Sequence, residues 1–441
     1  MSYQDLEKRD CKNLKSNNVG ARVTRSQQVK ILLSNSLAAF TVVGLTQAFG
    51  VFQAEYARIQ AVQDGIVRAE EMDDRALISA IGSLGNGGIV AVFAVLYYPH
   101  LPQLGIHVRY LCSFGTACIV LGLAAAAASH SVWHLFVTQG LLVGIGAGVL
   151  LYVLAPILPE YFPDRSGLAQ GTMYTAAAVG GMSFSFTIAA LLERIGARWT
   201  LGILAAFSLV TLSIASPLAL PPRKFEKRST SIIGLKTFRE PLFACLFLVN
   251  LIHPLTLAVP MTYGPLFAES LGLGFEHASY LLAINSGVGI PARLGAGALA
   301  DKIGHQNTLI IATAVYALAT WALWLPSAQT NNVGLFIGMS TCHGLINGVF
   351  NIVMNSAQKQ LFGDEMYYPK NGAMTSIRGV GYVVGVPLAG AMVNRVTGAD
   401  LRGTDFTKVI VYVGSLLTLS LLCLLNVRRL DAKQNGWKWA R

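Results

Sequence analysis

The sequence predicts an all-α membrane protein whose twelve transmembrane helices form two pseudo-symmetric six-helix bundles. Three observations predict this fold class. The 441 residues are 53% hydrophobic and 12% charged, which leaves too little polar surface for a water-soluble globule of this size. The apolar residues gather in runs of roughly 20, the length that crosses a bilayer as a helix. Short motifs of the first half also recur in the second half at a nearly constant offset.

The apolar runs give the order of the predicted helices. They cover residues 31–54, 76–98, 110–129, 135–157, 168–191, 200–220, 241–267, 279–300, 308–326, 334–357, 372–393 and 409–427. Of the 33 Lys and Arg residues, 23 lie in the two tails and the even-numbered connections, and 8 lie in the odd-numbered connections. Since basic residues favour the cytosolic side, we expect both termini in the cytosol.

The connection at 221–240 is long and basic, and it separates two segments that resemble each other. Residues 170–173 (QGTM) match residues 371–374 (NGAM) at an offset of 201. We therefore expect a cytosolic N-tail at 1–30, a six-helix bundle at 31–220, a cytosolic linker at 221–240, a second bundle at 241–427 and a cytosolic C-tail at 428–441. A parallel repeat of this kind is typical of a two-bundle transporter with its substrate site between the halves.

Composition excludes several classes of function. The net charge of +11 lies in short loops between apolar runs, so we expect the lipid bilayer as a partner and no nucleic acid. The six cysteines form neither a CxxC pair nor a His/Cys cluster, which predicts no metal site and no cofactor. A Walker sequence is absent, and no set of catalytic residues shares one membrane depth, so the chain is not expected to be an enzyme or an ATP-driven pump.

Two arginines lie within predicted spans, where a cation is costly unless it has a partner or faces a water-filled cavity. Arg293 is eight residues from the charged turn at Asp301, and Arg378 is seven residues into the eleventh span. The guanidinium of Arg293 can hold a carboxylate of the substrate, or it can bond backbone carbonyls as a packing residue. Arg378 can face the same cavity or brace the cytosolic gate.

Polar side chains mark one face of the tenth and the seventh spans. His343, Asn347, Asn351 and Asn355 follow one another every four residues, and Asn250 and His253 are three apart. In lipid such a stripe needs partners, so these residues are candidates for substrate binding or for hydrogen bonds between helices. No carboxylate lies in any predicted span, which leaves His343 and His253 as candidate proton carriers; alternatively, the substrate crosses as its own neutral acid.

The first half offers weaker candidates. Gln47 and Gln139 could bind substrate from the first and fourth spans. Six aromatic residues could form cavity walls or simply pack: Phe52, Tyr56, Tyr152, Tyr174, Tyr263 and Tyr382.

Several stretches resemble the major facilitator superfamily, and in particular the fungal branch of the monocarboxylate porter family. They are residues 48–53 (AFGVFQ), residues 161–171 (YFPDRSGLAQG), and Arg293 followed by residues 297–304 (GALADKIG). The resemblance implies the major facilitator fold, with the first, fourth, seventh and tenth spans lining a cavity. It also implies a cytosolic gate that contains Asp301, Lys302 and Arg165; a plain solvated loop is the alternative for Asp301 and Lys302.

The chain departs from that family at three places. The first-half turn, 98–105 (YPHLPQLG), lacks the expected Asp and basic residue, Gln47 stands where animal members carry Lys, and Gly289 stands where they carry Asp. These departures argue against simple lactate-type proton symport. We expect a secondary transporter of a small organic acid or weakly acidic metabolite, by alternating access. Export of a fungal secondary metabolite is favoured over proton-coupled uptake of a monocarboxylate, and a non-transporting nutrient sensor is a third reading. We favour the plasma membrane over the vacuole, although no retention or lipidation motif decides between them.

Overall fold

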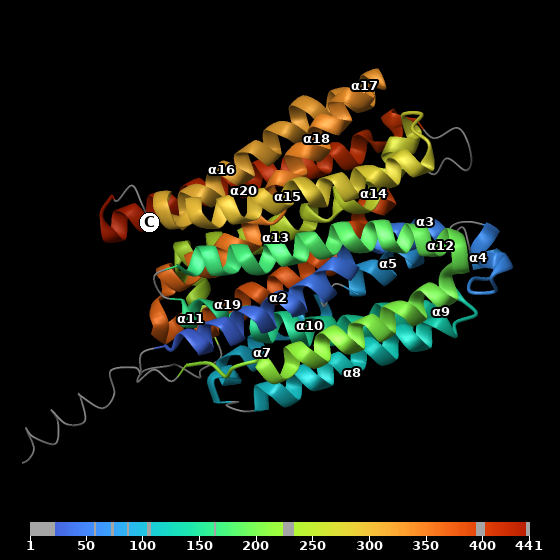
Figure 1. The fold of residues 1–441 in the computed structure, drawn as a ribbon. Coiled ribbons are helices and arrows are strands. Elements are labelled where there is room, and N and C mark those ends of the chain that lie inside the picture. The colour runs from blue at the N-terminus through green and yellow to red at the C-terminus, as the bar shows by residue number, and fades with distance from the viewer. Residues whose placement is uncertain are drawn as a thin grey trace, which may run out of the picture.

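The helices of the chain form a single bundle in which most axes run close to one common direction (Figure 1). The coordinates are a computed structural model, which describes residues 23–56, 59–71, 75–85, 88–103, 107–162, 165–223, 233–393 and 402–437. Within these ranges the regular elements are all helices. We call the described residues up to 223 the first half and those from 233 the second half.

The first half winds from the start of α2 to the end of α12. Its elements are α2 (Arg25–Gln47), α3 (Phe49–Tyr56), α4 (Ile59–Gln63), η1 (Ala69–Glu71), α5 (Arg75–Gly85), α6 (Gly88–Val92), α7 (Ala94–Tyr97), η2 (Tyr98–Gln103), α8 (His107–Ala127), α9 (Val132–Leu135), η3 (Phe136–Leu142), α10 (Val143–Leu154), α11 (Leu158–Tyr161) and α12 (Ser166–Leu218).

The second half follows the same plan. Its elements are η4 (Leu235–Arg239), α13 (Pro241–Leu257), α14 (Val259–Ser270), α15 (Phe275–Ile303), α16 (His305–Ala319), η5 (Thr320–Trp324), α17 (Leu325–Thr330), α18 (Val333–Ile346), α19 (Val349–Met392), η6 (Gly403–Phe406) and α20 (Thr407–Asn435).

Two long helices turn back on themselves at a glycine. Gly196 within α12 has a φ of 74°, and Gly363 within α19 has a φ of 67°, a conformation that other residues adopt only with strain. Eight of the described helical segments are long and apolar enough to cross a membrane. With α12 counted as two passes, and with α5–α7, α15 and the part of α19 after Gly363 added, the described chain makes the twelve passes that the sequence predicts.

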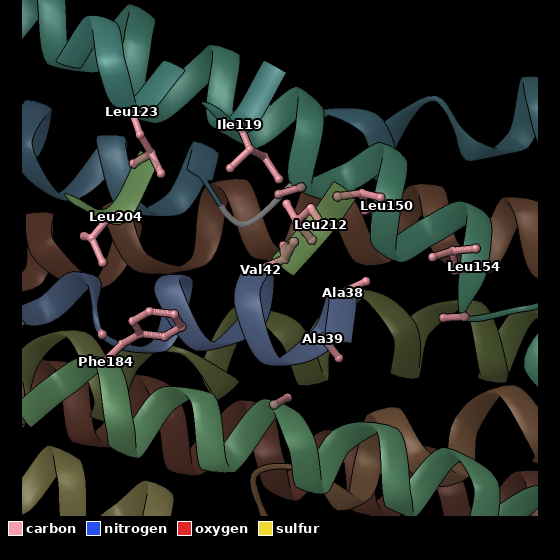
Figure 2. Packing of buried hydrophobic residues seen from close by; sticks show 14 of the residues in the cluster. Ala38, Ala39, Val42, Ile119, Leu123, Leu150, Leu154, Phe184, Leu204 and Leu212 are labelled. Carbon is pink, nitrogen blue, oxygen red and sulfur yellow. The ribbon is translucent and has the colours of Figure 1, made fainter. Parts of the chain in front are cut away.

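Each half has its own buried hydrophobic cluster. The larger cluster contains apolar residues from Ile31 to Ala219 together with Tyr367 and Tyr368 of the second half, and a second cluster contains residues from Val249 to Leu424. Figure 2 shows part of the first cluster, where side chains from α8, α10 and α12 gather around α2. Lipid tails are as apolar as these side chains, so close packing rather than exclusion from water holds the passes together.

The two halves meet where α12 packs along α15 and where α5–α7 pack along α19, and glycines set the distance between α12 and α15. A Cβ atom on Gly297 would meet the carbonyl oxygen of Gly167, and one on Gly171 would lie 2.9 Å from the carbonyl oxygen of Arg293. Small residues allow backbones to approach this closely. Substitutions at this crossing therefore act directly on the contact between the halves.

One end of the bundle carries both the start of α2 and the end of α20, and we call it the terminal end (Figure 1). The last pass continues beyond the predicted boundary at 427, because α20 runs to Asn435. Asp431 in this extension is fully buried, and it accepts hydrogen bonds from Gln306 and Asn435, each at 2.9 Å. Part of the segment expected as a C-tail is therefore docked helix.

Candidate functional site

A cavity lies between the two halves, with walls from α2, α3, α5, α10 and α12 on one side and α13, α14 and α19 on the other. Its volume is about 170 Å³, which gives room for roughly 11 to 17 waters at about 10–15 Å³ each. Its walls include Gln47, Gln53, Asn347, Asn351 and Asn355. Neutral amides therefore supply many of the hydrogen-bonding groups that face a solute here.

Arg378 is the charged residue among those that line the cavity, and Asn250 fixes its orientation. The Asn250 side-chain oxygen accepts hydrogen bonds from Arg378 Nε at 3.1 Å and from its terminal Nη2 at 2.7 Å. Asn250 is in turn held by its own donation to the Leu246 carbonyl at 2.8 Å. The guanidinium also lies 5.7 Å from the centre of the Phe350 ring. Asn250 is thus a positioning residue behind the wall, while Arg378 faces the cavity.

Arg293 is a residue of α15, and its side chain lies behind the cavity wall against the start of α19. Its side chain is 2% exposed and passes so close to Gly348 that a Cβ there would meet its Nε. Neither Nε nor Nη1 of Arg293 has a hydrogen-bond partner among the described residues. Within the described ranges, neither Arg293 nor Arg378 has a carboxylate within ion-pair distance. Two buried cations next to one cavity therefore lack an acidic counterion in the described chain.

The two histidines that the sequence singles out are buried outside the cavity lining. His343 Nε2 lies 3.1 Å from the carbonyl oxygen of Leu257, and its Nδ1 lies 3.1 Å from the amide nitrogen of Asn285. This pairing assigns the neutral tautomer that donates from Nε2 and accepts at Nδ1. His253 stacks on the Phe350 ring at 3.8 Å between ring centres. Both histidines join helices in this conformation.

Tyrosine side chains form much of the aromatic wall. Tyr152, Tyr174 and Tyr382 line the cavity as the sequence suggests, and Tyr98 joins them. The Tyr382 hydroxyl donates to Asn351 at 3.2 Å. The other three aromatic candidates, Phe52, Tyr56 and Tyr263, are buried elsewhere in the bundle.

The glutamines of the first half separate between two places. Gln47 lines the cavity and accepts a hydrogen bond from Ser286 of the second half at 3.3 Å. Gln139 lies in the π-helix η3 and accepts a hydrogen bond from Tyr56 at 2.7 Å, at the edge of a smaller second cavity. The structure therefore brings Gln47 together with Arg378, Asn347 and Asn351, and keeps Gln139 apart from them.

At the terminal end, Asp301 joins the two halves. Its carboxylate accepts hydrogen bonds from the backbone N–H groups of Gly167 and Leu168, both at 3.2 Å, at the start of α12. A negative charge is favourable at that position because the first N–H groups of a helix have no partner within the helix. Lys302 and Arg165 are exposed beside this contact.

Two helical segments reach beyond the ends of the predicted spans, and each contains a carboxylate that the sequence predicts to lie in a loop. Glu55 lies one residue before the end of α3 and Glu160 lies in α11, and both are buried. Glu160 accepts a hydrogen bond from the Tyr368 hydroxyl of the second half at 2.8 Å and one from the backbone N–H of Arg223 at 2.7 Å. It is therefore a second contact between the halves. Pro159 lies in the first turn of α11, a position where proline is common.

Replacing Glu160 with alanine is expected to lower the free energy of unfolding by about 1–3 kcal/mol, because two buried donors lose their acceptor. Glu240 provides a matched control: its carboxylate pairs with Lys370 at 2.8 Å, but its side chain is 55% exposed. Glu240→Ala should change stability by no more than about 1 kcal/mol. Denaturant unfolding of the purified variants checks this difference, and equal losses would contradict the importance of the buried contact.

Comparison with known proteins gives a family match over most of the chain. The family model described as Major Facilitator Superfamily matches residues 31–386. The fujikurins efflux protein of Gibberella fujikuroi is 26% identical over 403 residues, which cover 91% of this chain and 83% of that protein. An agnestins efflux protein of Paecilomyces divaricatus is 24% identical over 391 residues, with 89% and 86% covered. The crystal structure of a mutant of the nucleoside transporter NupG has a TM-score of 0.66 at 14% identity and covers 91% of this chain and 99% of that one, which shows the fold alone.

Proposed function

Because this chain belongs to the Major Facilitator Superfamily and is a multi-pass membrane transporter, we propose that it carries an organic acid or weakly acidic metabolite by alternating access. We further propose that it works in the export direction and belongs to the monocarboxylate porter branch. In this proposal the membrane is the plasma membrane, and the terminal end faces the cytosol.

The observation that carries the proposal is the pair of arginines without acidic counterions. Arg378 lines the cavity, and Arg293 lies behind its wall with unpaired nitrogens. The residues lining the cavity include no acidic side chain in the described chain. Two positive charges in a low-dielectric surrounding attract an anion strongly, and a guanidinium can hold a carboxylate with two parallel hydrogen bonds. The structure thus supports an anionic group on the substrate.

The contacts between the halves support alternating access. Asp301 and Glu160 hold the halves together at the terminal end through hydrogen bonds, and most of each hydrophobic cluster lies within one half. Since the cavity lies between the halves, separating them at that end would open it there. His343 is engaged with Leu257 and Asn285 in this conformation, so the proposal gives it no role as a proton carrier.

Two observations support export of a metabolite larger than lactate. Two relatives with more than four-fifths of their length covered are named as efflux proteins for fujikurins and agnestins. The cavity walls combine three asparagines with four tyrosines, which suits a solute that carries several oxygen atoms on a ring system.

Solute flux in proteoliposomes that enclose a pH-sensitive dye tests this proposal. The panel runs from short monocarboxylates to larger acidic polyketides, and vesicles without protein measure passive leak. The proposal predicts carrier-dependent flux of the larger acids. Proton-linked flux of short monocarboxylates alone would favour the uptake function, and no carrier-dependent flux of any acid would contradict the proposal.

A further inference from the structure

A second cavity, which we call the side pocket, lies inside the first half and adjoins the main cavity. Its volume is about 40 Å³. Thr46, Phe49 and Gly82 line both cavities. These shared residues place the side pocket directly beside the proposed substrate site.

The walls of the side pocket are almost entirely apolar. Ile119 and Leu123 of α8, Ala147 of α10 and Leu204 of α12 contribute to them. Ile119, Leu123 and Leu204 point toward the space around α2 in Figure 2. Side chains around a void lose dispersion contacts, so an unfilled apolar space between packed helices favours any apolar group that enters it.

One polar group remains available at the edge of the side pocket. The Thr46 hydroxyl is already used, because it donates to the Val42 carbonyl at 2.9 Å. Gln139 is 7% exposed and accepts from Tyr56 through its side-chain oxygen. Its amide nitrogen has no hydrogen-bond partner among the described residues. The pocket thus offers apolar walls and a single donor.

We propose that the side pocket is a hydrophobic subsite of the transporter, which takes a short alkyl chain or the edge of a ring from an amphipathic organic acid. The acidic group of the same molecule lies at the arginines of the main cavity. This inference rests on the proposed function and narrows it to amphipathic aryl or alkyl acids. The side pocket has space for roughly three or four water-sized positions, and this space limits the size of the alkyl or ring group that it can take.

Calorimetric binding to the purified full-length protein tests the subsite with benzoate and its para-ethyl, para-propyl, para-butyl and para-pentyl derivatives. The affinity of the wild type should rise roughly fourfold for each methylene until the pocket is full, and then stop rising. Leu204→Ala enlarges the pocket, so the rise should continue to longer chains. Ala147→Leu fills it, so the rise should disappear.

Leu212→Ala is the matched control. Leu212 lies on the same helix as Leu204 and is equally buried, but it lines neither cavity (Figure 2). This variant should keep the wild-type dependence of affinity on alkyl chain length. Comparing it with Leu204→Ala also corrects for partition of the probes into detergent, because that partition is the same in both samples. If Leu204→Ala and Leu212→Ala give the same dependence, the subsite is contradicted, whether or not Ala147→Leu folds.

Neutral para-alkylbenzyl alcohols separate this inference from the proposed function. If Leu204→Ala extends the rise in affinity of the alcohols to longer chains while the acids do not bind, the subsite stands and the anion site fails. If benzoate binds but chain length has no effect in either series, the anion site stands and the subsite fails.

Discussion

A glutamine in place of Arg293 is expected to lower carrier-dependent flux of organic acids by at least about tenfold without lowering the stability of the fold. The guanidinium is 2% exposed and has no acidic partner in the described chain. An uncompensated charge in a low-dielectric surrounding attracts an anion in the neighbouring cavity, and a loss of about 1.4 kcal/mol of that attraction corresponds to tenfold in affinity. Removing a buried and uncompensated cation removes a desolvation cost, so the free energy of unfolding should not fall.

Arg293→Lys keeps the charge but loses the planar pair of donors, so its flux should lie between those of the wild type and the glutamine variant. Arg239→Gln is the control, because Arg239 is exposed in η4 and is not among the residues that line the cavity. Flux in proteoliposomes and denaturant unfolding are measured for all four proteins. Wild-type flux in Arg293→Gln would show that this arginine does not serve the substrate.

A valine at position 297 is expected to prevent close contact of the two halves at the terminal end and to reduce flux by at least about fivefold. The added side chain would meet the backbone of Gly167, which cannot move aside as a flexible side chain can. Overpacking of this kind costs about 1–3 kcal/mol, or roughly 5- to 150-fold in the population of the closed arrangement. Asp301 would then also lose its contact with the start of α12.

Gly295→Val provides the control two residues earlier on α15, where an added Cβ meets nothing within 4 Å. Spin labels at the exposed positions Arg165 and Lys302, in a cysteine-free background, report the separation of the two helices. Double electron–electron resonance should show longer distances between the two spin labels in Gly297→Val than in Gly295→Val and the wild type. Identical distance distributions would mean that the glycine crossing does not set the closed arrangement.

Much of the fold follows from the sequence, because the bilayer imposes the length of each pass. The order of the twelve passes agrees with the runs of apolar residues. The boundaries are less predictable, since a helix can extend past the apolar run when its polar residues find partners. Glu160 and Asp431 are examples: each is buried at a helix end by hydrogen bonds from residues distant in the sequence.

The candidate site could be predicted only in part. The stripe on the tenth pass does identify Asn347, Asn351 and Asn355 as cavity residues. Four residues turn a helix by about 400°, so each step rotates the stripe by about 40° and His343 ends well away from Asn355. A break between α18 and α19 at Asn347 separates them further. The spacing of polar residues in the sequence does not show where a helix breaks. It also does not show which helix will form hydrogen bonds with a given polar side chain.

The central claim is that the arginines beside the cavity recognise the anionic group of the substrate. Its most direct test is the affinity of para-propylbenzoate relative to para-propylbenzamide at neutral pH, where the acid is ionised and the amide is not. We predict that the wild type prefers the carboxylate by at least about tenfold, and that the Arg293→Gln, Arg378→Gln double variant binds both probes equally. Equal affinity in the wild type, or a preference that survives in the double variant, would contradict the account.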